Sequence, residues 1–527
     1  MLRVFLQRYL NTMKFVLQPW QIYLVILASW INRQQQIVIE YLRTEKQVLK
    51  EKLGKKRILL NDDARLAWRK ERTSRKSEKH MFPKTTVPVV LSMVVCFAHL
   101  SWAGDFQELK SQNWHQWRGP HANGVSSTAD PPATWSEREN ILWKVAVDGH
   151  GNTTPIVWGD KVFLLTTIDT GRADPTLTPP NEQPDRPFGI KYPNTYHQYV
   201  VLCLDRNTGQ ELWRRVAAEE VPKEGHHGDN SFATASPTTD GQRLYAWFGS
   251  AGLYCYDLEG SPNWNRDLGP VKTRLSFGEG SSPVVHDYRV MIIRDQEDQS
   301  YLVVLDARSG ETVWQVDRDE PSAWATPLVV EQGGDTQVIT NGENRVRSYN
   351  LKDGKLIWEC GGQVSNVTPS PVATADTVFC MSGYRGSALY ALPLDATGDL
   401  TDTAEIRWTK SSGTPYVPSP LLYEGLLYFN QSNNPIMSCL DTEMGDIVID
   451  RTRMPGIKRL YASPVGANGR IYFAGRDGTT LVLERSRNFK IIATNQLDEG
   501  VDASPALVGN QLFLRGKSHL YCIASGR

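Results

Sequence analysis

A short polar stretch spanning residues 221–232 holds the side chains best suited to acid–base or metal chemistry. His226, His227, Asp229 and Asn230 all fall within it. Imidazole and carboxylate groups can transfer protons or ligate a metal, but adjacent histidines in a glycine-containing loop need further ligands from elsewhere in the chain. Two interpretations follow. One is a reactive cluster; the other is a solvated polar turn, which the composition of the loop favours.

Paired carboxylates can hydrolyse a glycosidic polymer, and Glu279 and Asp295 are the pair that this sequence offers. Nothing in their spacing requires that role, so polymer hydrolysis is the weakest of the functions considered. Alanine variants that kept such an activity would remove the hypothesis.

The cysteines give no indication of redox or metal chemistry. They include no C-x-x-C motif, no adjacent pair and no His/Cys metal spacing. Four of them recur at one place in successive sequence repeats, which predicts small buried thiols rather than a disulfide framework. These four are Cys203, Cys255, Cys439 and Cys522.

A repeated β-rich unit must position these groups, and residues 282–314 show it most clearly. Four short runs rich in Val, Ile, Leu and Tyr are separated by turn residues, and none has the length or period of a helix. A single four-stranded sheet cannot bury both of its faces, so the unit needs copies to pack against.

The first residues of the unit recur along the chain as Ser-Pro or Thr-Pro. Four-stranded repeats of about 40–50 residues predict a β-propeller. The last unit lacks a closing strand, and residues 141–147 supply one, which closes the ring without an exposed edge. We therefore predict an all-β, eight-bladed propeller over residues 141–527. The repeats begin at Thr154, Ser236, Ser282, Thr326, Ser370, Ser419, Ser463 and Ser504.

Residues 1–80 differ from the rest of the chain in charge and pattern. They carry a large excess of Lys and Arg, whereas the remainder carries an excess of Asp and Glu. Helix formers with apolar residues three to four apart predict a helix over 37–56. Residues 41–68 resemble the N-terminal region of transposase or integrase reading frames, without their catalytic core. We expect a start codon placed too far upstream, through a mobile-element remnant. The alternative is a genuine nucleic-acid-binding or membrane-tethering extension.

Residues 81–103 have the organisation of a secretory signal peptide. A charged beginning leads to an apolar run over 87–100, and small residues precede Gly104. A buried strand or short membrane helix is the alternative. Cleavage would release the chain into a periplasm-like compartment with no stable membrane span. Cys96 lacks the preceding small residue of a lipoprotein signal, so no lipid anchor is expected.

Between the signal and the first blade, residues 104–140 are predicted to be an irregular lead-in. Blade 1 then carries one long insertion, residues 169–196, whose six prolines argue against strand and helix and predict a surface loop. Loops longer than about 15 residues in a compact domain are usually functional or disordered.

A turn followed by a tryptophan marks the outer strand of several blades. It reads Asp205-x-x-Thr208-Gly209-x-x-x-Trp213 and recurs over 306–314 and 350–358. Asp with Thr-Gly or Ser-Gly makes a tight turn, and the indole can pack on the neighbouring blade. The pattern resembles the docking motif of pyrroloquinoline-quinone (PQQ) repeat propellers over residues 113–527. It is shorter in blade 2, stretched in blade 5 and eroded in blades 6 and 7. The expected docking residues are Trp143, Trp213, Trp264, Trp314, Trp358 and Trp408.

That family includes quinoprotein alcohol dehydrogenases and a non-catalytic outer-membrane assembly lipoprotein. The resemblance implies that catalytic members stack PQQ between a tryptophan and a disulfide of adjacent cysteines, with Ca²⁺ and an Asp base beside it. This sequence has no adjacent cysteines and no C-x-x-C-H haem motif. We expect no cofactor and no metal site, and PQQ with calcium is the disfavoured alternative.

Two sets of loop residues should gather around the channel on one face of the propeller: those just before each innermost strand, and those between the second and third strands. Their mixture of charges and aromatics favours a polar ligand or peptide over a metal; for any single residue, ordinary loop composition explains its presence equally well. The candidate ligand-binding residues are Glu279, Asp295, Trp324, Asn341, Arg385, Tyr416, Asn430, Arg476 and Asp477. Further members of the two sets are Asn152, Tyr461, Asp502, Glu343, Tyr384, Gln431 and Arg515.

Two functions from different classes remain. The first is an exported, non-catalytic propeller that binds or scaffolds a protein or other cell-envelope component, expected to be a monomer. The second is a PQQ-dependent dehydrogenase with an atypical site, in which Trp324 or another channel aromatic is the stacking plate. Absorbance changes on adding PQQ with Ca²⁺ would discriminate them. Nucleic acid is disfavoured as a partner because the acidic propeller lacks a basic stripe.

Overall fold

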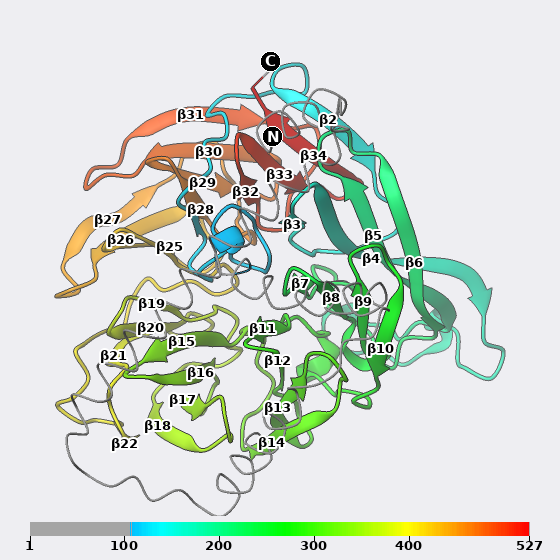
Figure 1. Cartoon of the computed structure of the whole chain (residues 1–527), viewed down its shortest axis with the longest axis horizontal. Helices are drawn as coiled ribbons and strands as arrows, with labels where there is room; N and C mark the ends of the chain where they lie inside the picture. Colours follow the sequence, from blue (N-terminus) through cyan, green and yellow to red (C-terminus); the bar gives the residue numbers. More distant parts are fainter. Residues whose placement is uncertain (1–105, 107, 526–527) are drawn as a thin grey trace, which may run out of the picture. The chain divides into compact units, whose positions relative to one another are not determined.

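The computed structural model describes residues 106 and 108–525, and within them the chain forms an eight-bladed β-propeller (Figure 1). The predictions for residues 1–80 and 81–103 lie outside the described residues. No helix in the part that the structure describes is long and apolar enough to cross a membrane.

Each blade is a four-stranded antiparallel sheet at its core, as predicted. Blade 1 comprises β3 (Ile156–Trp158), β4 (Lys161–Ala173), β5 (Thr195–Asp205) and β6 (Glu211–Glu220), and blade 2 comprises β7 (Thr238–Thr239), β8 (Arg243–Trp247), β9 (Leu253–Asp257) and β10 (Pro262–Arg266). Blade 3 comprises β11 (Val284–His286), β12 (Arg289–Arg294), β13 (Ser300–Asp306) and β14 (Thr312–Arg318). Blade 4 comprises β15 (Leu328–Gln332), β16 (Asp335–Asn341), β17 (Arg345–Asn350) and β18 (Leu356–Gly361).

The remaining blades follow the same order. Blade 5 comprises β19 (Val372–Ala373), β20 (Thr377–Ser382), β21 (Ala388–Pro393) and β23 (Trp408–Lys410), and blade 6 comprises β24 (Leu421–Tyr423), β25 (Leu426–Asn430), β26 (Ile436–Asp441) and β27 (Ile447–Arg453). Blade 7 comprises β28 (Val465–Ala467), β29 (Arg470–Ala474), β30 (Thr479–Glu484) and β31 (Ile491–Gln496). Blade 8 comprises β32 (Ala506–Val508), β33 (Gln511–Arg515), β34 (His519–Ala524) and β2 (Ile141–Ala146). Buried side chains of adjacent sheets form the core, and all six cysteines of the described residues are buried within it.

The N-terminal strand closes the ring, as the sequence predicted. β2 pairs antiparallel with β34, with Trp143 opposite Cys522, so the two ends of the propeller share blade 8. The chain cannot open between its first and last blades without breaking this pairing, which seals the edge that an open sheet would expose.

The outer-strand tryptophans join each blade to the next through a hydrogen bond and a glycine. Five indole Nε1–H groups donate to backbone carbonyls of the following blade at 2.8–3.2 Å: Trp143, Trp213, Trp264, Trp314 and Trp408. Each indole also lies against a left-handed glycine of the next turn. At Gly310, with φ +72°, a Cβ atom would approach the ring of Trp264 to 2.6 Å. Blade 6 keeps such a glycine, Gly445, although its motif is eroded in sequence.

Trp358 is the exception, because the turn it should meet in blade 5 is stretched. Its side chain is fully buried, and its Nε1 has no hydrogen-bond partner among the described residues. The extra residues of blade 5 form β22 (Gly398–Asp399), which pairs parallel with β18 beside Trp358. Two hydrogen bonds, from Leu400 N to Glu359 O at 2.8 Å and from Gly361 N to Thr401 Oγ1 at 2.9 Å, secure it. A strand pairing therefore joins blades 4 and 5 where the indole hydrogen bond is missing.

The Ser/Thr residues that begin the repeats form a ring around the channel. In seven successive steps, the backbone N–H of one repeat donates to the side-chain hydroxyl of the next, at 2.8–3.0 Å. The series runs from Thr154, which donates to Ser236, to Ser463, which donates to Ser504. This ring explains why a hydroxyl residue precedes proline in every repeat.

The lead-in does more than precede the first blade. It lies at the centre of the ring (blue in Figure 1), and its strand β1 (Val125–Ser126) pairs parallel with β28. Trp114 exchanges two backbone hydrogen bonds with Val157 of blade 1. Arg118 donates to Pro464 O at 2.7 Å and Pro420 O at 2.5 Å. The lead-in therefore contacts inner strands of several blades and plugs the channel.

The insertion of blade 1 differs from its prediction at both ends. β4 continues to Ala173 and β5 begins at Thr195, so the outer parts of residues 169–196 are paired strand. All six prolines lie between these parts, which is why the strands persist outside them. The middle contains only two short 3₁₀ turns, η1 (Pro180–Glu182) and η2 (Pro187–Gly189). Further 3₁₀ turns are η3 (Gly249–Ala251) and η4 (Arg274–Ser276).

Candidate functional site

A funnel-shaped cavity of about 620 Å³ opens at the channel, where the two predicted sets of loops meet. We call this cavity the funnel. It is lined by residues that precede the innermost strands, and by residues between the second and third strands of blades 5 and 6. Of the candidates and set members named from sequence, Asn152, Trp324, Tyr384, Tyr416, Tyr461 and Asp502 line it.

Aromatic side chains form much of the funnel wall. Tyr384 and Tyr416 lie with ring centroids 4.8 Å apart and planes inclined by 31°. The Nε1–H of Trp324 donates to Gly278 O at 2.6 Å, which fixes the indole. Trp117 of the lead-in also lines the cavity. The lead-in therefore gives the channel a floor, and the funnel is blind.

The insertion of blade 1 supplies part of the rim. Phe188, at its tip, is 62% exposed and has a left-handed backbone with φ +61°. Its ring packs edge-on against His227 and Phe277, with centroids 5.5 and 5.2 Å away. The hydroxyl groups of Tyr192 and Ser276 share a hydrogen bond of 2.7 Å. These contacts place an exposed aromatic ring at the entrance to the funnel.

The polar stretch at residues 221–232 also forms part of the funnel wall, and its Asp229 binds residues of blade 7. Arg476 donates to Asp229 at 2.8 Å and to Asp502 at 2.6 Å, and its guanidinium lies 4.0 Å from the ring centroid of Tyr461. Tyr461 donates to Asp229 at 2.6 Å. Burial opposes ionisation of Asp229, but Tyr461 and Arg476 hold its pKa below the ordinary value. Both carboxylates are thus paired with Arg476.

The histidines of that stretch are satisfied locally. His226 Nδ1 lies 2.7 Å from His227 O, and its ring packs edge-on against Phe232 at 4.6 Å. Burial lowers the pKa of His226, so this side chain is neutral at pH 7. No group of three or more His, Cys, Asp or Glu side chains within the described residues could hold a metal ion. The stretch is a structured polar turn in the funnel wall.

Four of the candidates named from sequence point into the protein instead of the funnel. Both Asp295 oxygens bind Arg318, and neither side chain is exposed. Glu279 accepts from the N–H and hydroxyl of Ser250, both at 2.7 Å. Asn341 and Asn430 are buried and use their side-chain amides to hold backbone carbonyls. These four residues support loops and blade contacts.

The other candidates lie close to the funnel without lining it. Arg385 is exposed with a left-handed φ of +52°, and its guanidinium lies 5.2 Å from the ring centroid of Tyr384. Arg476 holds the carboxylates described above. Asp477 follows it, and its buried Oδ1 has no hydrogen-bond partner among the described residues.

A buried carboxylate connects two loops of the funnel wall. Thr273 donates to Glu224 through its hydroxyl at 2.5 Å and through its backbone N–H at 3.2 Å. Burial raises the pKa of Glu224 to about 7, and the nearby Glu279 adds to this effect. The carboxyl group is therefore half protonated near neutral pH, between the 221–232 stretch and the loop that carries Phe277.

Glu224→Gln is expected to remove a pH dependence of stability. Because the folded pKa of about 7 exceeds the ordinary 4.5, the wild type keeps full stability below pH 4.5 and loses up to roughly 3 kcal/mol as the pH rises through 7. Chemical unfolding should show the variant equal to wild type at pH 4 and more stable at pH 8. The exposed Glu259→Gln is the control. A difference independent of pH would contradict the assignment.

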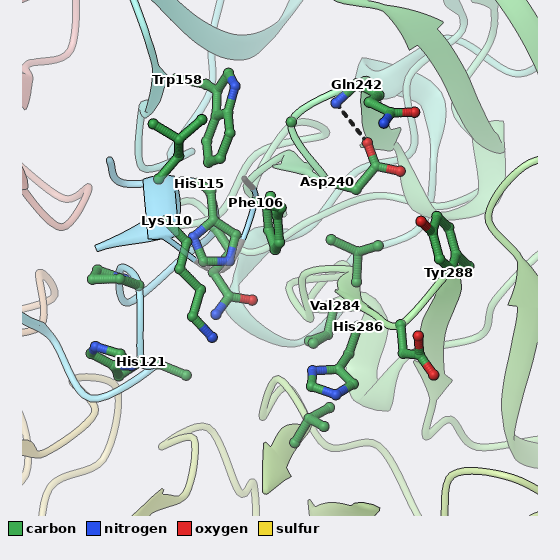
Figure 2. A pocket seen from close by; sticks show the side chains of 18 of the residues that line it. Phe106, Lys110, His115, His121, Trp158, Asp240, Gln242, Val284, His286 and Tyr288 are labelled. Atoms are coloured by element: carbon green, nitrogen blue, oxygen red, sulfur yellow. Dashed lines mark hydrogen bonds between the residues drawn. The ribbon is translucent and has the colours of Figure 1, made fainter. Parts of the chain in front are cut away.

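A second cavity of about 600 Å³ lies at the opposite ends of the inner strands (Figure 2). Phe106 of the lead-in stacks on Trp158 there, with ring centroids 5.2 Å apart. His115 is buried, which lowers its pKa to about 3, and its Nδ1 has no partner among the described residues. Asp287 and Glu331 face the basic groups of this cavity, so its charge is mixed.

The comparisons with known proteins agree with the docking geometry and the ring of blades. The family described as outer membrane protein assembly factor BamB matches residues 197–450. The resemblance to PQQ-like propellers is confirmed. BamB from Moraxella catarrhalis is similar in structure with a TM-score of 0.50 and 13% identity, over 72% of this chain and 96% of that one. No curated protein matches the sequence significantly.

A catalytic member of the PQQ-like propellers is similar to a comparable degree. Quinohemoprotein alcohol dehydrogenase from Comamonas testosteroni has a TM-score of 0.55 and 10% identity, over 80% of this chain and 83% of that one. At such low identities both similarities concern the fold alone. They do not decide between a scaffold and a dehydrogenase.

Sequence reasoning missed several residues of the funnel, among them Trp117, Phe188 and Arg459. Trp117 lies in the lead-in and Phe188 in the insertion of blade 1. Neither segment is part of the repeat, so comparison with other blades could not predict that either residue lies beside the channel. Arg459 could have been found, because it lies five residues before Pro464, which precedes β28, and in the same stretch as Tyr461.

Proposed function

We propose that this PQQ-like propeller is exported and acts without catalysis, binding a component of the cell envelope in its funnel. The blind end and the wall of the funnel support this proposal. Among the described residues that line it, the only carboxylates are Asp229 and Asp502, and Arg476 binds both. Neither is free to act as a general base. The aromatic rings and hydroxyl groups around them suit binding.

A PQQ-dependent dehydrogenase is the second candidate, favoured by Trp324, whose fixed indole could be a stacking plate. The residues around it do not fit the cofactor as catalytic relatives hold it. Calcium prefers unpaired carboxylate oxygens, and both funnel carboxylates are bound to Arg476. The chain also has no adjacent cysteine pair. We expect no absorbance change when PQQ and Ca²⁺ are added; saturable binding would favour the dehydrogenase.

Cross-linking in living cells tests the proposal. A photoreactive amino acid at position 188, on the funnel rim, should form adducts with an envelope component. The same residue at position 356, exposed on the outer strand β18, should not. Equal labelling at both positions, or no adduct at 188, would remove the funnel as the binding site. Export predicts that the native protein begins at Gly104, which mass spectrometry of the purified protein reads directly; an intact N-terminus would contradict it.

A further inference from the structure

We propose that the funnel binds an acidic saccharide, with its carboxylate or sulfate group near Arg459 and its sugar rings against the aromatic wall. This inference rests on the proposed function, because it names the chemical class of what the funnel binds. Three features of the funnel support it: the charge of its lining, the hydroxyl ring at its base and the arrangement of its aromatic rings.

One arginine in the lining has no salt-bridge partner among the described residues. Asp229 and Asp502 share Arg476, whereas Arg459 is exposed and forms no salt bridge within the described part of the chain. Its guanidinium lies 5.7 Å from the ring centroid of Tyr461, at the funnel wall. A cation in a cleft with low-dielectric walls attracts anions strongly, and the remainder of the propeller is acidic. Arg459 therefore offers an exposed cation to an anionic ligand in the funnel.

Two buried arginines lie directly behind the hydroxyl ring and have no carboxylate partner. Arg118 donates to Pro420 O and Pro464 O, each one residue beyond a ring serine. Arg515 donates to Thr153, one residue before the ring begins. Burial lowers the pKa of each to about 9, so both are charged at pH 7. Charges in a low-dielectric interior act over longer distances than exposed ones, and both favour an anion in the funnel.

The ring also offers hydrogen-bond donors. Each hydroxyl that accepts a backbone N–H still has its own hydrogen to donate. Five such hydroxyls line the funnel, and no hydrogen bond in which they donate is found among the described residues. They can donate to hydroxyl, carboxylate or sulfate oxygens of a ligand. The five belong to Ser236, Ser282, Thr326, Ser463 and Ser504.

The wall favours a saccharide over an acidic peptide. Peptides commonly bind by adding a strand to a sheet edge, but loops line the funnel and no strand edge does. Sugar rings instead present an apolar C–H face, with hydroxyl groups around the perimeter. Tyr384, Tyr416 and Trp324 offer flat apolar surfaces in the same cavity as the donors of the ring. A volume of about 620 Å³ is within the range of sites that enclose a ligand of a few rings.

Calorimetry with three sugar probes tests the inference on the full chain: an oligogalacturonate, a sulfated galactan oligomer and a neutral galactose oligomer. We expect at least one acidic probe to bind about tenfold or more tightly than the neutral one, more weakly at high salt. Arg459→Gln should remove that preference, and Tyr384→Ala should weaken all sugar binding. Arg487→Gln, an exposed arginine in the turn between β30 and β31 that pairs with Asp441 at the end of β26, is the control and should change nothing.

The two acidic probes distinguish carboxylate from sulfate as the source of the charge. Equal binding of neutral and acidic probes, or binding that Arg459→Gln leaves unchanged, would overturn the inference. If no sugar binds, while the position-188 cross-link persists, the saccharide is wrong and the proposed function stands. If an acidic peptide binds and no sugar does, the saccharide is again wrong. Loss of both sugar binding and cross-link would remove the funnel as a binding site.

Discussion

Replacing Arg318 with Met is expected to lower the free energy of unfolding by about 3–5 kcal/mol, because it leaves a buried carboxylate without a partner. Arg318 Nε donates to Asp295 Oδ1 at 2.8 Å and its second terminal nitrogen to Oδ2 at 3.1 Å, with both side chains fully buried. The same guanidinium donates to Thr340 and Tyr349 at 2.8 Å. The variant loses all four bonds at once.

Denaturant unfolding followed by tryptophan fluorescence measures this loss. The double variant Arg318→Met with Asp295→Leu should recover most of the stability, because an apolar pair of similar volume costs little where a lone charge costs much. Arg487→Met, which breaks only an exposed pair, should stay within about 0.5 kcal/mol of wild type. If the double variant were as unstable as the single one, packing rather than charge would explain the loss.

Asp295 also shows what the sequence could not reveal about the site. The sequence correctly placed Asp295 between the second and third strands of blade 3. The same rule, that residues between these strands lie near the channel, also placed Tyr384 and Asn430 at loop ends there. The rule locates a backbone position but not the direction of a side chain. That direction depends on a partner such as Arg318, which lies 23 residues later. The side-chain direction of a charged candidate was therefore the hardest to predict, because an ion pair inside the protein can orient it away from the funnel.

The fold was predictable because its determinants are local and repeated. Ser-Pro or Thr-Pro recurs in every blade, and the turn with glycine and the docking tryptophan recur in most of them. The pattern of one blade therefore identifies the strands of the others. Blade 5 shows the limit of this argument. Its turn is stretched in the sequence, but nothing there predicted that the added residues would form β22 against β18. Such a pairing is a contact between blades and has no counterpart elsewhere in the sequence.

Arg118→Met is expected to lower the free energy of unfolding by about 2–5 kcal/mol and to loosen the floor of the funnel. The guanidinium is buried and donates to Pro464 O, Pro420 O and Asn123 O. Each buried carbonyl left without a donor costs about 1–3 kcal/mol, and methionine fills a similar volume without donating. The variant loses stability because the lead-in is attached less firmly to blades 6 and 7. The carbonyls of Pro420 and Pro464 precede the innermost strands and belong neither to a docking turn nor to the blade core.

Limited proteolysis distinguishes this local effect from general destabilisation. In the variant, cleavage should concentrate between residues 113 and 124 while the blades resist. The reason is that the bonds of Arg118 attach the lead-in to blades 6 and 7, whereas the blades keep their own strand pairing. Ligand binding in the funnel should fall with it, since Trp117 lies next to Arg118 and forms the floor. Arg318→Met serves as the comparison, because it should destabilise the propeller without selective cleavage of the lead-in. Equal cleavage of the lead-in in both variants would show that Arg118 is one contact among many and that the plug is held elsewhere.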